Sequence, residues 1–198
     1  RIIAADGYGM VAAFDRFTGQ PVWQQRFAMI EKAGFSVQGL LDRRDPAFVS
    51  GGVGVGAGLV LVGTTHGEVV ALDVADGTER WRSRVGTEVG AAPSTGDGKV
   101  FVQTIDDRIS ALDVESGEVV WTYDSQMPLL TLRGTSAPVF DQGIVYSGFA
   151  NGKVAALRAE NGEPMWEQRV MLPEGRSELD RIVDVDARVM LDGGSMYA

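Results

Sequence analysis

A repeated motif, A-x-D-x-x-x-G-x-x-x-W, is the feature that most constrains how this chain can fold. It occurs four times, and the last copy carries Arg158 in place of the Asp. All four tryptophans of the chain stand at its final position. Self-similarity of this kind indicates a stack of like units, each packing mainly on its neighbours. The four copies end at Trp23, Trp81, Trp121 and Trp166.

The spacing of the copies predicts the fold. Successive tryptophans are 58, 40 and 45 residues apart, and a period of roughly 40 to 45 is typical of four-stranded propeller blades. The longer first interval implies an insertion of roughly 15 residues over that period. Each copy is expected to form a hairpin with a glycine turn, with its Trp on the outer strand filling space between neighbouring blades. Apolar strands closed by polar turns supply the other half of each blade, so the fold class is all-β.

The repeat resembles that of quinoprotein-like β-propellers, which commonly have eight blades. We therefore expect residues 1–198 to form a partial propeller of about four blades, with no separate second domain. Half a ring leaves apolar blade faces and strand edges exposed, so either the other half was cut away or two fragments associate. The chain begins at Arg1 without Met, signal peptide or lipidation motif, and we interpret it as a fragment whose targeting segment has been lost.

Composition narrows the functional classes. The net charge of −9 disfavours nucleic acid as a partner, because an acidic surface repels phosphate. The chain has no Cys and a single His, His66. It therefore lacks the residues that thiol nucleophiles, catalytic triads and His-based zinc sites require. His66 fills the turn position of Asp106 and Asn151 and is expected to be an exposed turn residue. No catalytic, cofactor-binding or metal-binding residue is predicted, and no stretch is apolar enough to span a bilayer.

Two features repeat with the motif and are interpreted as structural. The recurring carboxylates are expected to accept backbone hydrogen bonds in their turns rather than to form a catalytic ring. The tryptophans are expected to pack between blades rather than to hold a quinone, since a cofactor on the axis needs residues that do not repeat. The repeated carboxylates are Asp15, Asp73 and Asp113.

Three stretches break the repeat, at 30–50, 127–135 and 172–187. Binding residues concentrate on irregular loops held by a rigid scaffold, so these stretches are the candidate functional segments. In the second, leucines surround Arg133, an arrangement that suits an interface hot spot or a cover for a blade edge. In the third, aspartates alternate with other residues near two arginines. We favour ion pairing or capping over Ca²⁺ binding, which needs six or more oxygen ligands.

The order and spacing of several segments resemble the BamB family, the lipoprotein propellers of the outer-membrane β-barrel assembly machinery. The match extends over the whole chain and covers roughly the N-terminal half of the family propeller. The segments are 40–41 (LL), 50–53 (SGGV), 130–138 (LTLRGTSAP), 151–154 (NGKV) and 177–186 (SELDRIVDVD).

The resemblance implies a non-catalytic scaffold without a cofactor, at the periplasmic face of the outer membrane. Its partners would be the POTRA domains of BamA and unfolded outer-membrane proteins, with membrane attachment only through a lipidated Cys that this chain lacks. In that picture the leucines dock on apolar POTRA surface, the Arg reaches an acidic group and the aspartates meet basic groups. The implied BamA-binding residues are Leu130, Leu132, Arg133, Asp184 and Asp186.

The alternative is a fragment of a quinone-dependent dehydrogenase propeller, which shares the repeat. A resemblance to such enzymes would imply a Ca²⁺–quinone site with a vicinal Cys pair, and this chain has no Cys. One departure from the repeat also stands out: Ala187-Arg188 replaces the Ala-Pro of 92–93 and 137–138. The strand that follows is therefore expected to be displaced or locally rebuilt.

Overall fold

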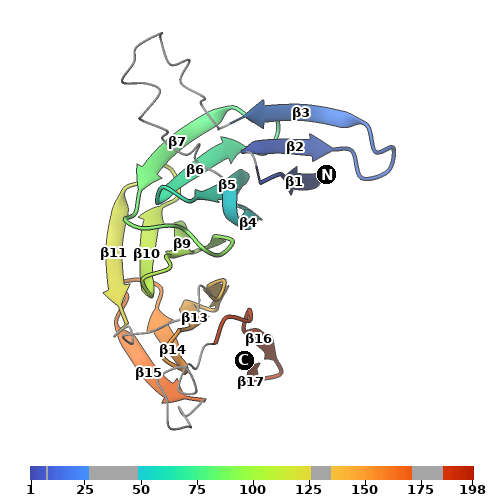
Figure 1. Ribbon diagram of the computed structural model, residues 1–198. Helices are drawn as coiled ribbons and strands as arrows, with labels where there is room; N and C mark the ends of the chain where they lie inside the picture. The colour runs from blue at the N-terminus through green and yellow to red at the C-terminus, as the bar shows by residue number, and fades with distance from the viewer. Residues whose placement is uncertain (8, 27–48, 126–134, 171–184) are drawn as a thin grey trace, which may run out of the picture.

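The computed structural model describes residues 1–7, 9–26, 49–125, 135–170 and 185–198. Every regular element in these ranges is a β-strand, and the strands form antiparallel sheets that stand side by side along an arc (Figure 1). The outermost strands β3, β7, β11 and β15 follow the convex side of the arc (Figure 1). No helix in the described part of the chain is long and apolar enough to cross a bilayer.

Each sheet follows chain order from the inside of the arc to the outside, so each corresponds to one blade. Blade one contains β1 (Ile2–Ala5), β2 (Met10–Phe14) and β3 (Pro21–Arg26). Blade two contains β4 (Val49–Gly56), β5 (Leu59–Thr64), β6 (Glu68–Asp73) and β7 (Glu79–Arg84). Blade three contains β8 (Ser94–Gly96), β9 (Lys99–Gln103), β10 (Arg108–Asp113) and β11 (Val119–Asp124). Blade four contains β12 (Val139–Asp141), β13 (Ile144–Gly148), β14 (Lys153–Arg158) and β15 (Pro164–Arg169), and β16 (Met190–Asp192) and β17 (Ser195–Tyr197) form a final hairpin.

The tryptophans join one blade to the next, as the repeat predicts. The indole nitrogen of Trp81 donates to the carbonyl of Val114, 2.9 Å away in the repeat turn of blade three. Its ring lies on Gly117 so closely that a Cβ there would stand 2.5 Å from Trp81 Cε3. Trp23 and Trp121 make the same contacts, with Val74 and Gly77 and with Ala159 and Gly162 respectively.

The fourth tryptophan differs. Trp166 is 40% exposed, whereas the other three are 8–9% exposed. Its ring meets Tyr146 of its own blade at a centroid distance of 6.2 Å. The prediction of inter-blade packing is therefore confirmed for three of the four.

The repeated aspartates are turn residues, as predicted. Asp113 Oδ1 accepts the backbone N–H groups of Ser116 at 2.8 Å and Glu115 at 3.0 Å. These hydrogen bonds, that of Ser116 first, hold the pKa of Asp113 below its usual value. In the fourth copy the turn closes with Arg158, whose carbonyl accepts from Gly162 N at 2.9 Å. The backbone thus forms the turn by itself, and the Asp side chain reinforces it.

Two sequence predictions need adjustment. The excursion expected at 30–50 ends earlier, because Val49 and Ser50 already belong to β4; residues 27–48 lie outside the described residues. Gly51 and Gly52 have φ of 74° and 91°, a conformation open mainly to glycine, and they sit in an irregularity of pairing between Val49 and Val53. A strand can therefore continue across two glycines that interrupt its apolar pattern.

The departure at Ala187-Arg188 is also visible. The innermost strands β8 and β12 begin directly after Pro93 and Pro138, whereas β16 begins two residues after Arg188. The turn that follows comes one residue later as well, at Gly193 and Gly194. The strand forms, but one residue further along than in blades three and four.

Candidate protein-interaction face

All three stretches that break the repeat are connections of one type. Each runs from the outermost strand of one blade to the innermost strand of the next, after β3, β11 or β15 and up to β4, β12 or β16. Strand direction alternates within a blade, so these connections lie on the same face as the turns between second and third strands. We call this the connection face; it carries the turns 64–67, 104–107 and 149–152.

Backbone hydrogen bonds fix the start of each connection on this face. Val85 N donates to Gly67 O at 2.8 Å, and the same contact recurs one and two blades later. Ser125 N donates to Asp107 O at 3.2 Å, and Val170 N donates to Gly152 O at 2.9 Å. The opposite face, which we call the turn face, carries the glycine turns of the motif.

The second and third stretches end side by side. The Ser136 hydroxyl is buried and donates to the carbonyl oxygen of Ala187 at 2.8 Å, across 51 residues of sequence. Val185 is anchored as well, because its N–H donates to Phe149 O at 3.2 Å and its side chain is 5% exposed. The two segments that the sequence singled out separately therefore return to the scaffold at one place.

Of the residues that the family resemblance implies for BamA binding, Asp186 lies within the ranges that the structure describes. It lies between buried Val185 and exposed Ala187, and its own side chain is exposed. An exposed carboxylate on an anchored backbone is suited to meet a basic group on a partner. Leu130, Leu132, Arg133 and Asp184 lie outside the described residues.

A buried polar network joins blades three and four on the same side as Ser136 and Val185. Gln103 donates through Nε2 to Gly148 O at 2.9 Å and accepts a hydrogen bond from the Ser147 hydroxyl. Asp107, which is 1% exposed, accepts the N–H of Ala150 at 3.1 Å with Oδ2. Buried polar groups that are satisfied in this way specify one arrangement of the blades. The junction between blades three and four is therefore held in one defined arrangement.

Asp107 was not singled out by the sequence reasoning, and Arg188 was noted there as a departure from the repeat but not as a candidate site residue. Asp107 has φ of 59° and stands where the neighbouring blades have Gly67 and Gly152. Arg188 lines a cavity of about 260 Å³ with residues of β4 and with the segments 92–95 and 137–140. Both break a repeated position, an Asp for a Gly and an Arg for a Pro, and for Asp107 this break is the signal by which it could have been found.

Two carboxylates on this face, Asp106 and Asp124, are held by neighbouring side chains. Burial raises the pKa of the Asp106 carboxyl, but hydrogen bonds from Thr104 and Thr87 outweigh it and bring the pKa below its ordinary value. Arg108 lies 2.6 Å from Asp124, and this carboxylate raises the pKa of the guanidinium. His66 is exposed in its turn, as predicted. Within the described ranges, no group of three or more His, Cys, Asp or Glu side chains could hold a metal ion.

Comparison with known proteins assigns the family. The family model described as outer membrane protein assembly factor BamB matches residues 7–198. The chain belongs to this family. A BamB from Xanthomonas campestris pv. campestris is 41% identical over 198 residues, which are 100% of this chain and 47% of that one. The chain spans about half the length of the curated relatives it matches.

Solved structures agree on the fold. The crystal structure of BamB from Moraxella catarrhalis superposes with a TM-score of 0.83 at 29% identity, over 98% of this chain and 54% of that one. A quinohemoprotein alcohol dehydrogenase from Comamonas testosteroni superposes with a TM-score of 0.62 at 21% identity, over 84% and 33%. The second likeness is one of fold alone. The predicted class, an all-β propeller of the quinoprotein-like type, is confirmed.

Proposed function

We propose that this chain is part of a non-catalytic scaffold subunit of the outer-membrane β-barrel assembly machinery. It acts at the periplasmic face of the outer membrane, binds the POTRA domains of BamA and assists the folding and insertion of outer-membrane proteins. Family membership over residues 7–198 is the observation that supports this role. We further propose that residues 1–198 form a single partial propeller without a second domain.

The binding surface that we propose is the part of the connection face above blades three and four. Leu130, Leu132 and Arg133 belong to one connection there, and Asp184 and Asp186 belong to the next. The hydrogen bond between Ser136 and Ala187 supports a shared surface, because it holds the ends of both connections together. Arg133 would meet an acidic group and the aspartates basic groups, with the leucines on apolar surface between them.

Charge reversal tests this assignment. Arg133→Glu should abolish capture of a purified BamA POTRA fragment by the 198-residue chain, because one like-charge contact then replaces an attractive one. The matched control is Arg158→Glu, the same reversal at a side chain that is 57% exposed on the turn face. Unchanged capture by the first variant, or equal loss in both, would overturn the proposed surface.

The absence of catalysis is tested separately. The chain is incubated with a pyrroloquinoline quinone, Ca²⁺, an alcohol and a dye that accepts electrons. If the chain is a non-catalytic scaffold, the dye is reduced no faster than in the protein-free control. Turnover above that control would instead place the chain with the dehydrogenase propellers whose fold it shares.

A further inference from the structure

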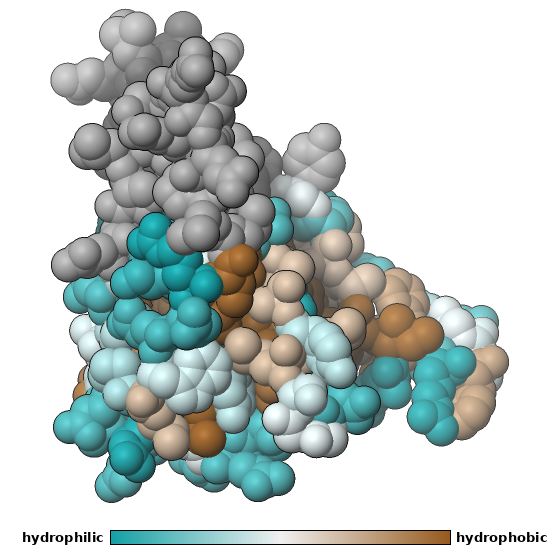
Figure 2. Space-filling model, turned by 90° about the horizontal axis from the view of Figure 1, so that it is seen from below, coloured by the Kyte–Doolittle hydropathy of each residue, from teal (hydrophilic) through white to brown (hydrophobic). Residues whose placement is uncertain are grey.

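Asp107 is unusual among the charged residues of this chain. Hydrophilic residues cover much of the surface in Figure 2, where water solvates charged side chains. Among the buried residues that the structure describes, Asp107 alone has an acidic or basic side chain, and it is 1% exposed. Burying a carboxylate costs free energy unless hydrogen bonds or a cation replace the lost water. The turn itself does not need this side chain, because Gly67 and Gly152 fill the same position in the neighbouring blades.

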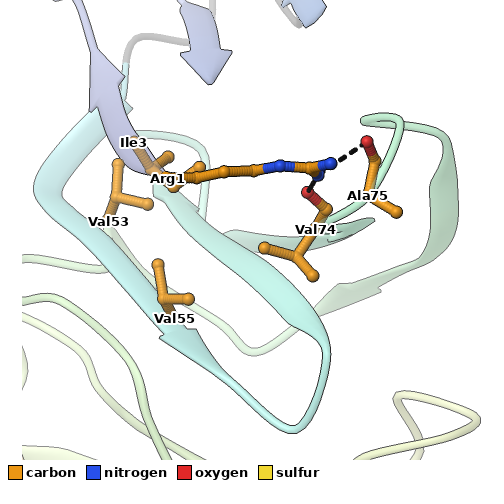
Figure 3. A pocket seen from close by; sticks show the side chains of 6 residues that line it. All are labelled: Arg1, Ile3, Val53, Val55, Val74 and Ala75. Carbon is orange, nitrogen blue, oxygen red and sulfur yellow. Dashed lines mark hydrogen bonds between the residues drawn. The ribbon is translucent and has the colours of Figure 1, made fainter. Parts of the chain in front are cut away.

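The contact between blades three and four, where Asp107 lies, differs in polarity from the contact between blades one and two. Blades one and two form a groove of about 480 Å³, and Arg1 lies across one end of it, donating to Val74 O and Ala75 O at 2.6 and 2.7 Å (Figure 3). Arg1 is exposed, and no charged residue among those lining the groove is buried. The buried carboxylate is thus a feature of one junction and not of the repeat. The apolar residues that line the groove are Ile3, Val53, Val55, Val74 and Ala75.

The Asp107 carboxylate holds a peptide group of blade four. Its Oδ2 and Oδ1 accept the N–H of Ala150 at 3.1 and 3.2 Å. The carbonyl of the same peptide group, Phe149 O, accepts the N–H of Val185 at 3.2 Å. A peptide group is planar and rigid, and hydrogen bonds in a chain polarise one another. The carboxylate and Val185 are therefore coupled through a single peptide group.

Blade three shows how the equivalent N–H is satisfied elsewhere. Its turn places Ile105 where blade four has Ala150, and Ile105 N donates to Glu88 O at 2.9 Å. Glu88 belongs to the connection between β7 and β8, so the acceptor there is a backbone carbonyl of a connection. In blade four the acceptor is a side chain from the turn of the preceding blade. The position of this peptide group therefore depends on which residue stands at 107.

Val185 carries this constraint to Asp186. The Val185 side chain is 5% exposed and packs on Gly148, where a Cβ would stand 2.6 Å from Val185 Cγ1. On the other side of Asp186, Ala187 O accepts from the Ser136 hydroxyl at 2.8 Å. Asp186 is thus an exposed carboxylate whose two neighbours are both held by hydrogen bonds. Asp107 determines the acceptor of one of these two bonds.

We propose that Asp107 is a positioning residue: through the backbone of Val185 it fixes the direction in which Asp186 presents its carboxylate to a basic group of BamA. This inference rests on the proposed function of Asp186 and extends it. Asp107 contributes no contact of its own to a partner, because it is 1% exposed. A change at 107 therefore alters the affinity for POTRA domains by way of the connection that carries Asp186.

Asp107→Gly tests the proposal, because it places the glycine of the two neighbouring blades in this turn and removes the carboxylate. Hydrogen–deuterium exchange of the 198-residue chain, followed by NMR, should be at least about tenfold faster at the amides of Ala150 and Val185. The Val89 amide, which donates to Thr64 O at 3.1 Å one junction earlier, should exchange as in the parent. Capture of a purified BamA POTRA fragment should weaken roughly 3- to 30-fold. Asp107→Asn should retain most of both properties, because its amide oxygen still accepts the N–H and Asn tolerates positive φ.

Asp106→Gly is the matched control. It removes a carboxylate one residue away whose hydrogen bonds come from Thr87 and Thr104, so exchange at Val185 and capture should keep their parental values. Unchanged exchange at Val185 in Asp107→Gly would overturn the positioning role, and so would faster exchange with capture unchanged. A parent chain that captures no POTRA fragment, although exchange responds as expected, would overturn the proposed function instead and leave the coupling of Asp107 to Val185 in place.

Discussion

Gly117→Ala is the sharpest test of the way in which successive blades pack. Gly117 has φ of 74°, and an Ala in the left-handed region costs about 1–2 kcal/mol. Its Cβ would also stand 2.5 Å from Trp81 Cε3, well inside van der Waals contact. The indole cannot withdraw without losing its hydrogen bond to Val114, so an overpacking cost of about 1–3 kcal/mol is added. The expected total loss of stability is about 2–5 kcal/mol.

Gly98→Ala in the same blade separates the two terms. Gly98 has φ of 69° and no atom within 4 Å of a Cβ built on it, so only the backbone cost of about 1–2 kcal/mol applies. Both variants are compared with the parent by urea unfolding, followed by tryptophan fluorescence and circular dichroism. The difference between them measures the contact of Gly117 with Trp81. Equal losses would refute the tight packing of the repeat turn under the indole.

Three other outcomes follow from the same geometry. Trp81→Ala should cost about 3–5 kcal/mol in urea unfolding, the range for a buried Trp, whereas Trp166→Ala should cost clearly less because Trp166 is 40% exposed. Asp113→Asn should retain more thermal stability than Asp113→Ala, because an amide oxygen can still accept from the turn N–H groups. Hydrogen bonds from Tyr123, first, and Lys153 lower the pKa of Glu167 in the folded chain. Their stabilisation is therefore present above the unfolded-state pKa and is lost as pH falls through the folded one, so Tyr123→Phe should reduce the fall in unfolding midpoint measured below about pH 4.5.

Much of the scaffold can be predicted because the same local sequence pattern occurs in four copies. A Trp at a fixed distance after a turn Gly implies a hairpin whose large side chain must be covered, and the next blade is the surface available. The turn aspartates and the exposure of His66 follow from short-range rules of the same kind. These features depend on residues that are close in sequence, so pattern and spacing are enough to predict them.

Contacts across the repeat could not be predicted in this way. Ser136 and Ala187 meet over 51 residues, and their meeting depends on the paths of two connections that break the pattern. In every blade a bulge falls between the last two strands just before the tryptophan, as between Ala111 and Leu112 opposite Trp121 and Val119. A bulge adds one residue without changing the apolar pattern, so the sequence does not show it. Four of the five implied binding residues lie outside the described residues, and their positions remain predictions.

The two faces of the arc are expected to respond to substitution in different ways. On the turn face, the repeat turns lie directly against the indoles and accept their N–H groups, so a change there alters the contact between blades and therefore stability. On the connection face, Ser136 and Val185 hold the ends of two connections by hydrogen bonds to Ala187 and Phe149. The residues proposed to bind BamA belong to these two connections, and we expect them to serve binding rather than the contacts between blades. Substitutions there should change binding while leaving the urea midpoint near that of the parent, and a large loss of stability in Arg133→Glu would contradict this separation of roles.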